Sequence, residues 1–272
     1  MNRIGLEYIT LMGTHPLDFI RIAAGAGCAN VALFATYYAP AGSGQQSWSL
    51  AHDPALRRDV AQCLGDHGVS LALVDGVAVY RNQSVEQFRP LFDVMGELGA
   101  YRVNTVSFDE IGRTFDETAR LVEMAQPYGI TVTMEPCPVL TVRTLAQALD
   151  MIRQVEQPNF RLLIDTMHVS RTGEAEAASR VDPGLIDYVQ ICDAPLAMPP
   201  SNEAYMDEAM HERQIPGEGE LPLVSILRNV RPDVVVSGEV PLRSLEKAGV
   251  SAEERVQRIV DATRRVLVDA TG

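Results

Sequence analysis

Acidic side chains stand at the ends of three apolar segments that read as buried β-strands. Glu135 follows TVTM, Asp165 ends RLLID, and Glu239 follows VVVSG. A carboxylate at the end of a buried strand is costly to desolvate unless it is paired or bound to a cation. A single acid often caps a helix or satisfies a loop instead, but three in register at adjacent strand ends favour a shared cation site.

The segment DYVQICD adds an amide oxygen, that of Gln190, with Asp193 just beyond it. Carboxylate and amide oxygens suit Mg²⁺ or Mn²⁺, whereas zinc usually prefers histidine and cysteine ligands. We therefore expect one divalent cation, Mn²⁺ or Mg²⁺, held by four residues: Glu135, Asp165, Gln190 and Glu239.

His168 follows Asp165 by three residues in DTMH and is expected to face the same site. It is either a proton shuttle and substrate-hydroxyl contact or a structural histidine. Arg213, in HERQIPGEGE, either binds a substrate oxygen through its planar fork or forms a loop ion pair. The candidate catalytic acids and bases are Glu135, Glu239 and His168.

Three further polar residues end other predicted strands and are weaker candidates for substrate contacts: Glu7, Asp75 and Asn104. Cys137 and Cys192 also fall near strand ends. Neither cysteine has a base paired with it by sequence, which argues against nucleophilic catalysis.

Eight short apolar runs bounded by turn residues are predicted strands: Ile4–Tyr8, Asn30–Phe34, Ser70–Asp75, Arg102–Val106, Thr131–Glu135, Arg161–Asp165, Asp187–Ile191 and Val234–Glu239. Helical spacing is clearest between them at Leu17–Gly25, Pro54–His67, Val85–Leu98, Phe115–Tyr128 and Thr144–Val155, and after the last strand at Ala252–Val268. An unbroken alternation of this kind predicts an α/β protein with a single (β/α)8 TIM-barrel domain over residues 1–272.

A doubly wound open sheet is the structural alternative, but no Gly-rich phosphate fingerprint follows the first strand. Two connections are long, 36–51 and 194–219. Both would lie at the carboxyl face of the barrel, where they are either active-site lids or flexible loops without a role in the site.

Composition excludes several classes of function. The net charge of −13 disfavours nucleic acid, because that affinity rests on neutralising phosphates with lysine and arginine. The residues Met1 to Thr10 follow a strand-like pattern with neither a basic n-region nor an apolar h-region, and no apolar run is long enough to span a membrane. We expect a cytoplasmic protein with no membrane partner.

These motifs together resemble the sugar phosphate isomerase/epimerase family, with its xylose isomerase-like TIM barrel: MEP, LIDTMH, VQICDAP, R-x-x-P-G-E-G-E and SGEVP. The resemblance implies a Mn²⁺ or Mg²⁺ site at Glu135, Asp165, Gln190 and Glu239. In ketose epimerases of this family the two glutamates also form an acid/base pair. Those enzymes usually carry histidine where this chain has Gln190, and the glutamine form is similar to the bacterial 3-dehydroshikimate dehydratase branch.

The resulting hypothesis is a metal-dependent isomerase or epimerase of a small sugar or cyclitol. It would abstract a proton α to a carbonyl through a metal-stabilised enediolate. The alternative is a lyase that dehydrates a cyclic keto acid or keto-cyclitol, such as 3-dehydroshikimate or inosose. The two reactions differ after the proton is removed: isomerisation or epimerisation returns a proton to the intermediate, whereas dehydration expels a β-hydroxyl.

Two other classes fit the sequence less well. A multi-metal endonuclease would need more than five histidines and a basic groove. A non-catalytic ligand-binding barrel is disfavoured because all four candidate ligand positions carry oxygen donors. The apolar positions of Ala252–Val268 suit core packing and a homo-oligomer surface equally.

Overall fold

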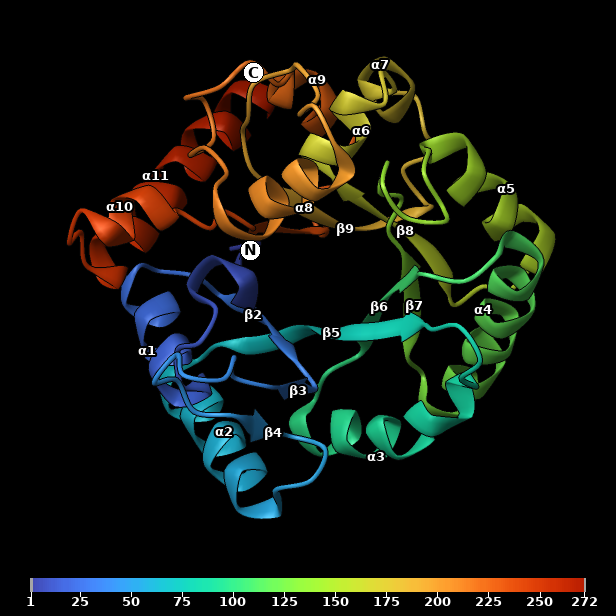
Figure 1. Cartoon of the computed structure of the whole chain (residues 1–272), viewed down its shortest axis with the longest axis horizontal. Helices are drawn as coiled ribbons and strands as arrows, with labels where there is room; N and C mark the ends of the chain where they lie inside the picture. The colour runs from blue at the N-terminus through green and yellow to red at the C-terminus, as the bar shows by residue number, and fades with distance from the viewer. Residues whose placement is uncertain (1, 272) are drawn as a thin grey trace.

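The computed structural model describes residues 2–271, which form a closed barrel of eight parallel strands (Figure 1). Around the barrel the strand order is β1-β10-β9-β8-β7-β6-β5-β2. The strands are β1 Ile4–Glu7, β2 Asn30–Phe34, β5 Ser70–Val79, β6 Arg102–Ser107, β7 Thr131–Met134, β8 Phe160–Asp165, β9 Ile186–Ile191 and β10 Val235–Gly238. The predicted TIM-barrel fold is confirmed, and the doubly wound alternative is wrong because β1 pairs with both β2 and β10.

Helices form the outer ring around the strands (Figure 1). Asp53 caps α2 by accepting from two backbone N–H groups, and Gly68 ends the helix in the left-handed conformation. Among the described residues, every helix is too short or too polar to cross a bilayer. The helices are α1 Pro16–Gly25, α2 Pro54–His67, α3 Arg89–Leu98, α4 Ile111–Ala125, α5 Leu145–Val155, α6 Thr166–Arg171, α7 Ala175–Ala178, α8 Asn202–His211, α9 Leu223–Leu227, α10 Arg243–Lys247 and α11 Ala252–Thr271, with short 3-10 turns η1 Tyr8–Leu11, η2 Val85–Phe88 and η3 Gln126–Tyr128.

The apolar core has two parts, as a packed barrel requires. A large cluster fills the space between the strands and the helices, where Phe19, Phe92 and Ile259 are fully buried. A smaller cluster contains Ala32, Ala72, Leu73, Leu163, Tyr188 and Val235. Tyr188 extends this smaller cluster toward the polar residues of the barrel mouth, since its hydroxyl meets Glu7.

The third predicted strand does not end at Asp75 as expected. β5 continues to Val79, but its pairing with β2 stops at Asp75 and its register with β6 shifts between Val74 and Val77. Gly76 has φ +87°, which an L side chain rarely adopts. The strand is therefore irregular at Asp75, and this residue still reaches the cavity at the barrel mouth.

Both long connections contain regular structure that the sequence analysis missed. Connection 36–51 forms a short antiparallel hairpin, β3 Thr36–Tyr37 with β4 Trp48–Ser49. Connection 194–219 contains α8, whose apolar residues Tyr205, Met206, Ala209 and Met210 span less than two turns, too short a run to stand out in a long polar connection. The Ser201 side chain caps α8 by accepting from the Ala204 N–H, and this was the available signal.

Candidate active site

The four predicted ligand residues lie at the carboxyl ends of four neighbouring strands. Glu135 directly follows β7, Asp165 ends β8, Gln190 is the second-last residue of β9, and Glu239 directly follows β10. In the barrel register Asp165 is paired with Gln190, and Gln190 with Ser237. The parallel fold therefore brings all four residues to one side of the barrel mouth.

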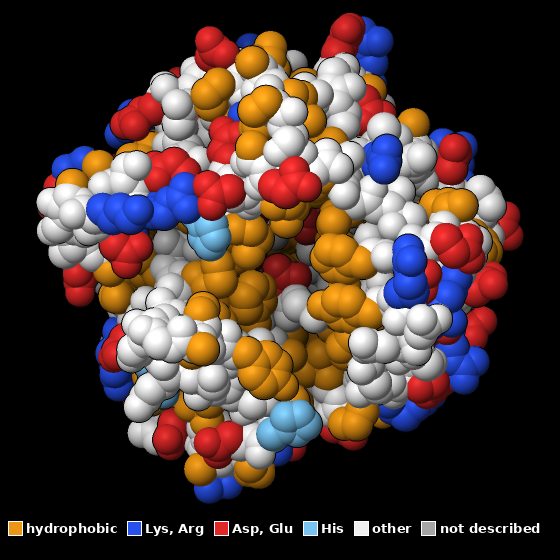
Figure 2. Space-filling view, viewed as in Figure 1, with side chains coloured by type: hydrophobic (Ala, Val, Ile, Leu, Met, Phe, Trp, Pro, Cys, Tyr) orange, Lys and Arg blue, Asp and Glu red, His pale blue; other side chains and the backbone are white. Residues whose placement is uncertain are grey.

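A cavity of about 260 Å³ opens at this mouth and is lined by Glu135, His168, Arg213 and Glu239. The mouth is hollowed, and hydrophobic side chains surround it with acidic groups at its floor (Figure 2). The apolar walls include Phe34, Leu140, Met206 and Met210 together with a stacked aromatic pair, Tyr80 and Phe108. Apolar walls with few polar groups are typical of a small-molecule site.

The potential cation ligands form two adjacent groups, within each of which the donor atoms lie within 4.8 Å of one another. One group is Glu135, Asp165 and His168, and the other is Glu7, Asp75 and Glu239. The structure thus associates Glu239 with Glu7 and Asp75, a neighbourhood that the four-ligand prediction did not include. It also brings His168 to the same site, as expected.

Arg213 lies between the two groups. Its Nη1 is 2.6 Å from Asp165 Oδ2, its Nη2 is 2.8 Å from Glu239 Oε2, and its Nε donates to the Ala209 carbonyl at 2.8 Å. This guanidinium holds the pKa of Asp165 well below its usual range, and the two carboxylates raise the pKa of Arg213. Arg213 therefore pairs with two candidate ligands at once, while a substrate contact by its side chain stays a prediction.

The pKa values of three neighbouring glutamates are raised instead. Burial, with the charges of Asp165 and Asp75, raises the pKa of Glu135 to about 8. Burial raises the pKa of Glu7 to about 7 against an opposing hydrogen bond from the Tyr188 hydroxyl, at 2.7 Å. Burial and nearby acids also raise the pKa of Glu239, despite Arg213.

A divalent cation fits this set of residues. Five acids, those of the two groups above, face one guanidinium, and a bound cation would supply the counter-charge that lets the buried carboxyl groups ionise. Gln190 Oε1 is buried and accepts no hydrogen bond from the described residues, which leaves an oxygen donor free. Glu135 is also oriented, because Asn104 donates to its Oε2 at 2.6 Å.

His168 is fixed by a residue that the sequence analysis did not identify. Its Nδ1 is 2.7 Å from the hydroxyl of Tyr205, which is fully buried on α8. Burial raises the pKa of Tyr205 far above its usual value, so the hydroxyl keeps its proton, and a buried O–H needs an acceptor. His168 Nδ1 is its acceptor, which assigns the remaining ring proton to Nε2.

This tautomer determines what His168 can do. Its Nε2 is 3.5 Å from Glu135 Oε1 and borders the cavity. Burial lowers the pKa of His168 to about 4, so the ring is neutral near pH 7. A neutral ring with its proton on Nε2 offers an N–H donor to the cavity, which favours the hydrogen-bond role over the general-base role.

Two tyrosines of the site, Tyr188 and Tyr205, were not predicted from the sequence, for different reasons. Tyr188 shares the inward face of β9 with Gln190 by the two-residue period of a strand, so this spacing could have revealed it. Tyr205 reaches His168 from a helix far along the chain. No local pattern marks that contact.

Comparison with known proteins defines the class to which this barrel belongs. A family model described as xylose isomerase-like TIM barrel matches residues 20–266. The chain therefore belongs to the xylose isomerase-like TIM barrel family, in agreement with the resemblance found in the sequence.

Individual relatives are more distant. The chain is 28% identical over 277 residues to a 3-dehydroshikimate dehydratase of Pseudomonas aeruginosa; the match covers 95% of this chain and 40% of the length of that relative. It is 26% identical over 201 residues to an inosose isomerase of Bacillus licheniformis, covering 67% of this chain and 68% of that protein. The fold matches a crystal structure of IOLI protein with a bound zinc atom at a TM-score of 0.76, with 20% identity and coverage of 97% and 98% of the two chains.

The raised pKa values of Glu7 and Glu135 predict how the metal-free chain responds to pH. Between about pH 6.5 and 8.5 the folded chain binds more protons at these groups than the unfolded chain, whose glutamates have already ionised. The free energy of unfolding should therefore fall by about 1–3 kcal/mol as pH rises across this window. His168 opposes this trend only at the lower edge of the window, because its folded pKa is lowered to about 4 while an unfolded histidine titrates near 6.5; the opposing contribution is smaller and ends by about pH 7.5.

Urea denaturation of chelator-treated protein at several pH values measures this slope. Glu135→Gln should flatten it, and added Mn²⁺ should reverse it, because a cation binds the ionised carboxylates. A metal-free protein whose stability is constant or rises over this window would contradict the assignment.

Removal of the Tyr205 hydroxyl tests the His168 tautomer. In Tyr205→Phe the ring loses the donor to Nδ1, so we expect the proton to redistribute between the two nitrogens. ¹⁵N NMR of histidine-labelled protein reports this directly, with Nδ1 unprotonated in the wild type and mixed signals in the variant. Wild-type spectra with a protonated Nδ1 would refute the assignment whatever the variant shows.

Proposed function

We propose that this chain is a divalent-cation-dependent isomerase or epimerase that moves a proton on the carbon α to a carbonyl of a small cyclic polyhydroxylated ketone. The observation that carries the proposal is the pair Glu135 and Glu239. They follow β7 and β10, with two strands between them, and both line the cavity. Burial raises the pKa values of both carboxyl groups, which suits the removal and return of a proton.

Glu135, Asp165, Gln190 and Glu239 would hold the cation, for which we propose Mn²⁺ or Mg²⁺. When bound, the cation would polarise the substrate carbonyl and stabilise the negative charge that develops there. The ionised carboxylate of one glutamate takes the α proton, and the protonated carboxyl of the other returns one. The Nε2–H of His168 donates to a substrate oxygen, and Arg213 keeps Asp165 and Glu239 in place.

The cavity walls favour an uncharged substrate. Arg213 is the one arginine or lysine among the described residues that line it, and two carboxylates already engage its guanidinium. The stacked Tyr80 and Phe108 offer an apolar surface to the C–H face of a ring. A keto-cyclitol meets both conditions, and the similarity to an inosose isomerase supports this substrate class.

Dehydration is the second candidate, and Gln190 is the observation that favours it. The similarity to a 3-dehydroshikimate dehydratase covers most of this chain. In that reaction a glutamate takes the α proton, the new C=C bond forms, and a β-hydroxyl leaves as water. The protonated carboxyl of the other glutamate would supply the proton that leaves with the hydroxyl as water, and the Nε2–H of the neutral His168, which borders the cavity, would stabilise the leaving oxygen by a hydrogen bond.

Proton NMR in D₂O distinguishes the two reactions. Mn²⁺-loaded protein is incubated with ketoses, inosose and 3-dehydroshikimate, and the compounds are followed with time. We expect deuterium at the carbon α to the carbonyl of a cyclic polyol ketone without an olefinic signal. An olefinic or aromatic product would instead establish the dehydratase.

Glu239→Gln should lower the exchange rate by at least about 100-fold, the usual range for loss of a general acid or base. Glu253→Gln, an exposed glutamate of α11, is the matched control and should leave the rate unchanged. If no compound shows a cation-dependent change, the isomerase and dehydratase proposals both fail for these substrates, and a ligand-binding barrel gains support.

A further inference from the structure

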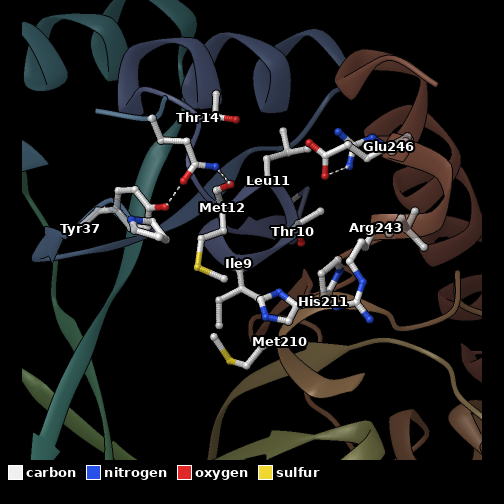
Figure 3. Close-up of a pocket in the computed structure, with 15 residues that line it drawn as sticks. Ile9, Thr10, Leu11, Met12, Thr14, Tyr37, Met210, His211, Arg243 and Glu246 are labelled. Atoms are coloured by element: carbon white, nitrogen blue, oxygen red, sulfur yellow. Dashed lines mark hydrogen bonds and ion pairs between the residues drawn. The ribbon is translucent and has the colours of Figure 1, made fainter. Parts of the chain in front are cut away.

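A second cavity of about 240 Å³ lies beside the active cavity (Figure 3). Its walls come from η1, connection 36–51, the end of α8 and the segment after β10. Ile9 and Met210 line both cavities, so these side chains lie at the boundary between them. Figure 3 shows Tyr37 and Met12 toward one side of the second cavity and Arg243 and Glu246 toward the other.

Arg255 is the unusual residue of this cavity. It is 7% exposed, and its guanidinium donates no hydrogen bond to any residue that the structure describes; its Nε is fully buried. The nearest acid is Glu246, 3.8 Å from Nη1, and the Glu246 side chain is 66% exposed. Water screens such a pair, so it compensates a buried charge weakly.

The position of Arg255 in its helix makes its positive charge still more costly to bury. Arg255 is the fourth residue of α11, where the partial positive charge of the helix dipole repels a cation. A buried guanidinium in that position is stabilised by an anion placed against it. Glu253 and Glu254 lie in the same first turn, but among the described residues Glu246, which is exposed, is the one acid within 4 Å of the guanidinium.

Two more basic groups line the same cavity. His211, the last residue of α8, borders it, and so does Arg243, whose guanidinium pairs with Asp207 at 2.8 and 2.7 Å. A chain with a net charge of −13 thus places two arginines and a histidine around one small cavity.

We propose that this cavity binds a small oxyanion, a carboxylate or phosphate group, with Arg255 as its main partner. A planar guanidinium can donate two parallel hydrogen bonds to such a group. Glu246 is the internal anion that the ligand displaces. This site goes beyond the proposed function, because its binding requires neither the cation nor turnover.

The oxyanion has two possible sources, and the position of the cavity makes both testable. It is either the pendant acidic group of a substrate whose ketone lies in the active cavity, or a separate small anion. Among the described residues that line the active cavity, the one arginine, Arg213, is already paired with two carboxylates. A pendant carboxylate bound to Arg255 would therefore favour a keto acid as substrate.

Calorimetric titration of the whole chain with malonate and with inorganic phosphate, at low ionic strength, tests the site directly. We expect saturable binding of at least one of these anions. Arg255→Met keeps the length of the apolar stem and should weaken that binding by at least about tenfold. Arg258→Met, an exposed arginine on the same helix, is the matched control and should bind as the wild type does.

Glu246→Gln keeps the test decisive if Arg255→Met folds poorly. It removes the competing internal anion while Arg255 stays in place, so affinity should rise by about three- to tenfold. Failure of both anions to bind the wild type and Glu246→Gln would overturn the proposal. So would binding that Glu246→Gln and a folded Arg255→Met leave unchanged.

Deuterium exchange then separates the two sources. If Arg255→Met raises KM for an anionic ketone and not for a neutral one, the site holds a pendant group of the substrate. If it abolishes malonate or phosphate binding and leaves both KM values unchanged, the ligand is a separate anion. If no ketone exchanges at all, the proposed function fails while the calorimetric result still decides the anion site.

Discussion

The contact of one buried guanidinium with two carboxylates organises the mouth of this barrel. Arg213 joins Asp165 at the end of β8 to Glu239 after β10, and its Nε also holds the carbonyl of Ala209 on α8. One positive charge cannot balance the five acids gathered there. Burial, together with the surrounding acids, raises the pKa values of Glu135 and Glu239, and a divalent cation would supply the positive charge that lets them ionise. The pH dependence of folding stability, the proton transfer and the cation binding therefore all depend on the same buried carboxyl groups.

The same contact explains why α8 belongs to the site. Besides Arg213, α8 is attached through Tyr205, which meets His168, and through Glu208, which pairs with the buried Arg171 at 2.6 Å. These contacts hold α8 over the cavity and set the tautomer of His168. Asp207 of α8 also pairs with Arg243, so the segment 194–219 is anchored at several points, which fits a fixed wall better than a freely moving lid.

The sequence predicted the barrel because each strand is a short apolar run ended by turn residues, and parallel strands bring their carboxyl ends to one face. This reasoning located Glu135, Asp165, Gln190, Glu239 and His168 at one mouth. It could not reveal that Arg213 bridges Asp165 and Glu239, because residues 48 positions apart carry no local mark of their contact. The helix α8 was missed because its apolar stripe spans less than two turns. The end of β5 was misplaced because the chain continues past an irregularity at Gly76.

Cation binding tests the central claim most directly. Metal-free protein is titrated with Mn²⁺ at pH 7.5, and free Mn²⁺ is followed by electron paramagnetic resonance. The electrostatics described above predict one tightly bound ion per chain, with affinity lowered at least about tenfold by Gln190→Leu and unchanged by Asp261→Asn, an exposed acid of α11. Absence of a stoichiometric site, or a site that neither Gln190→Leu nor Glu239→Gln weakens, would contradict the account.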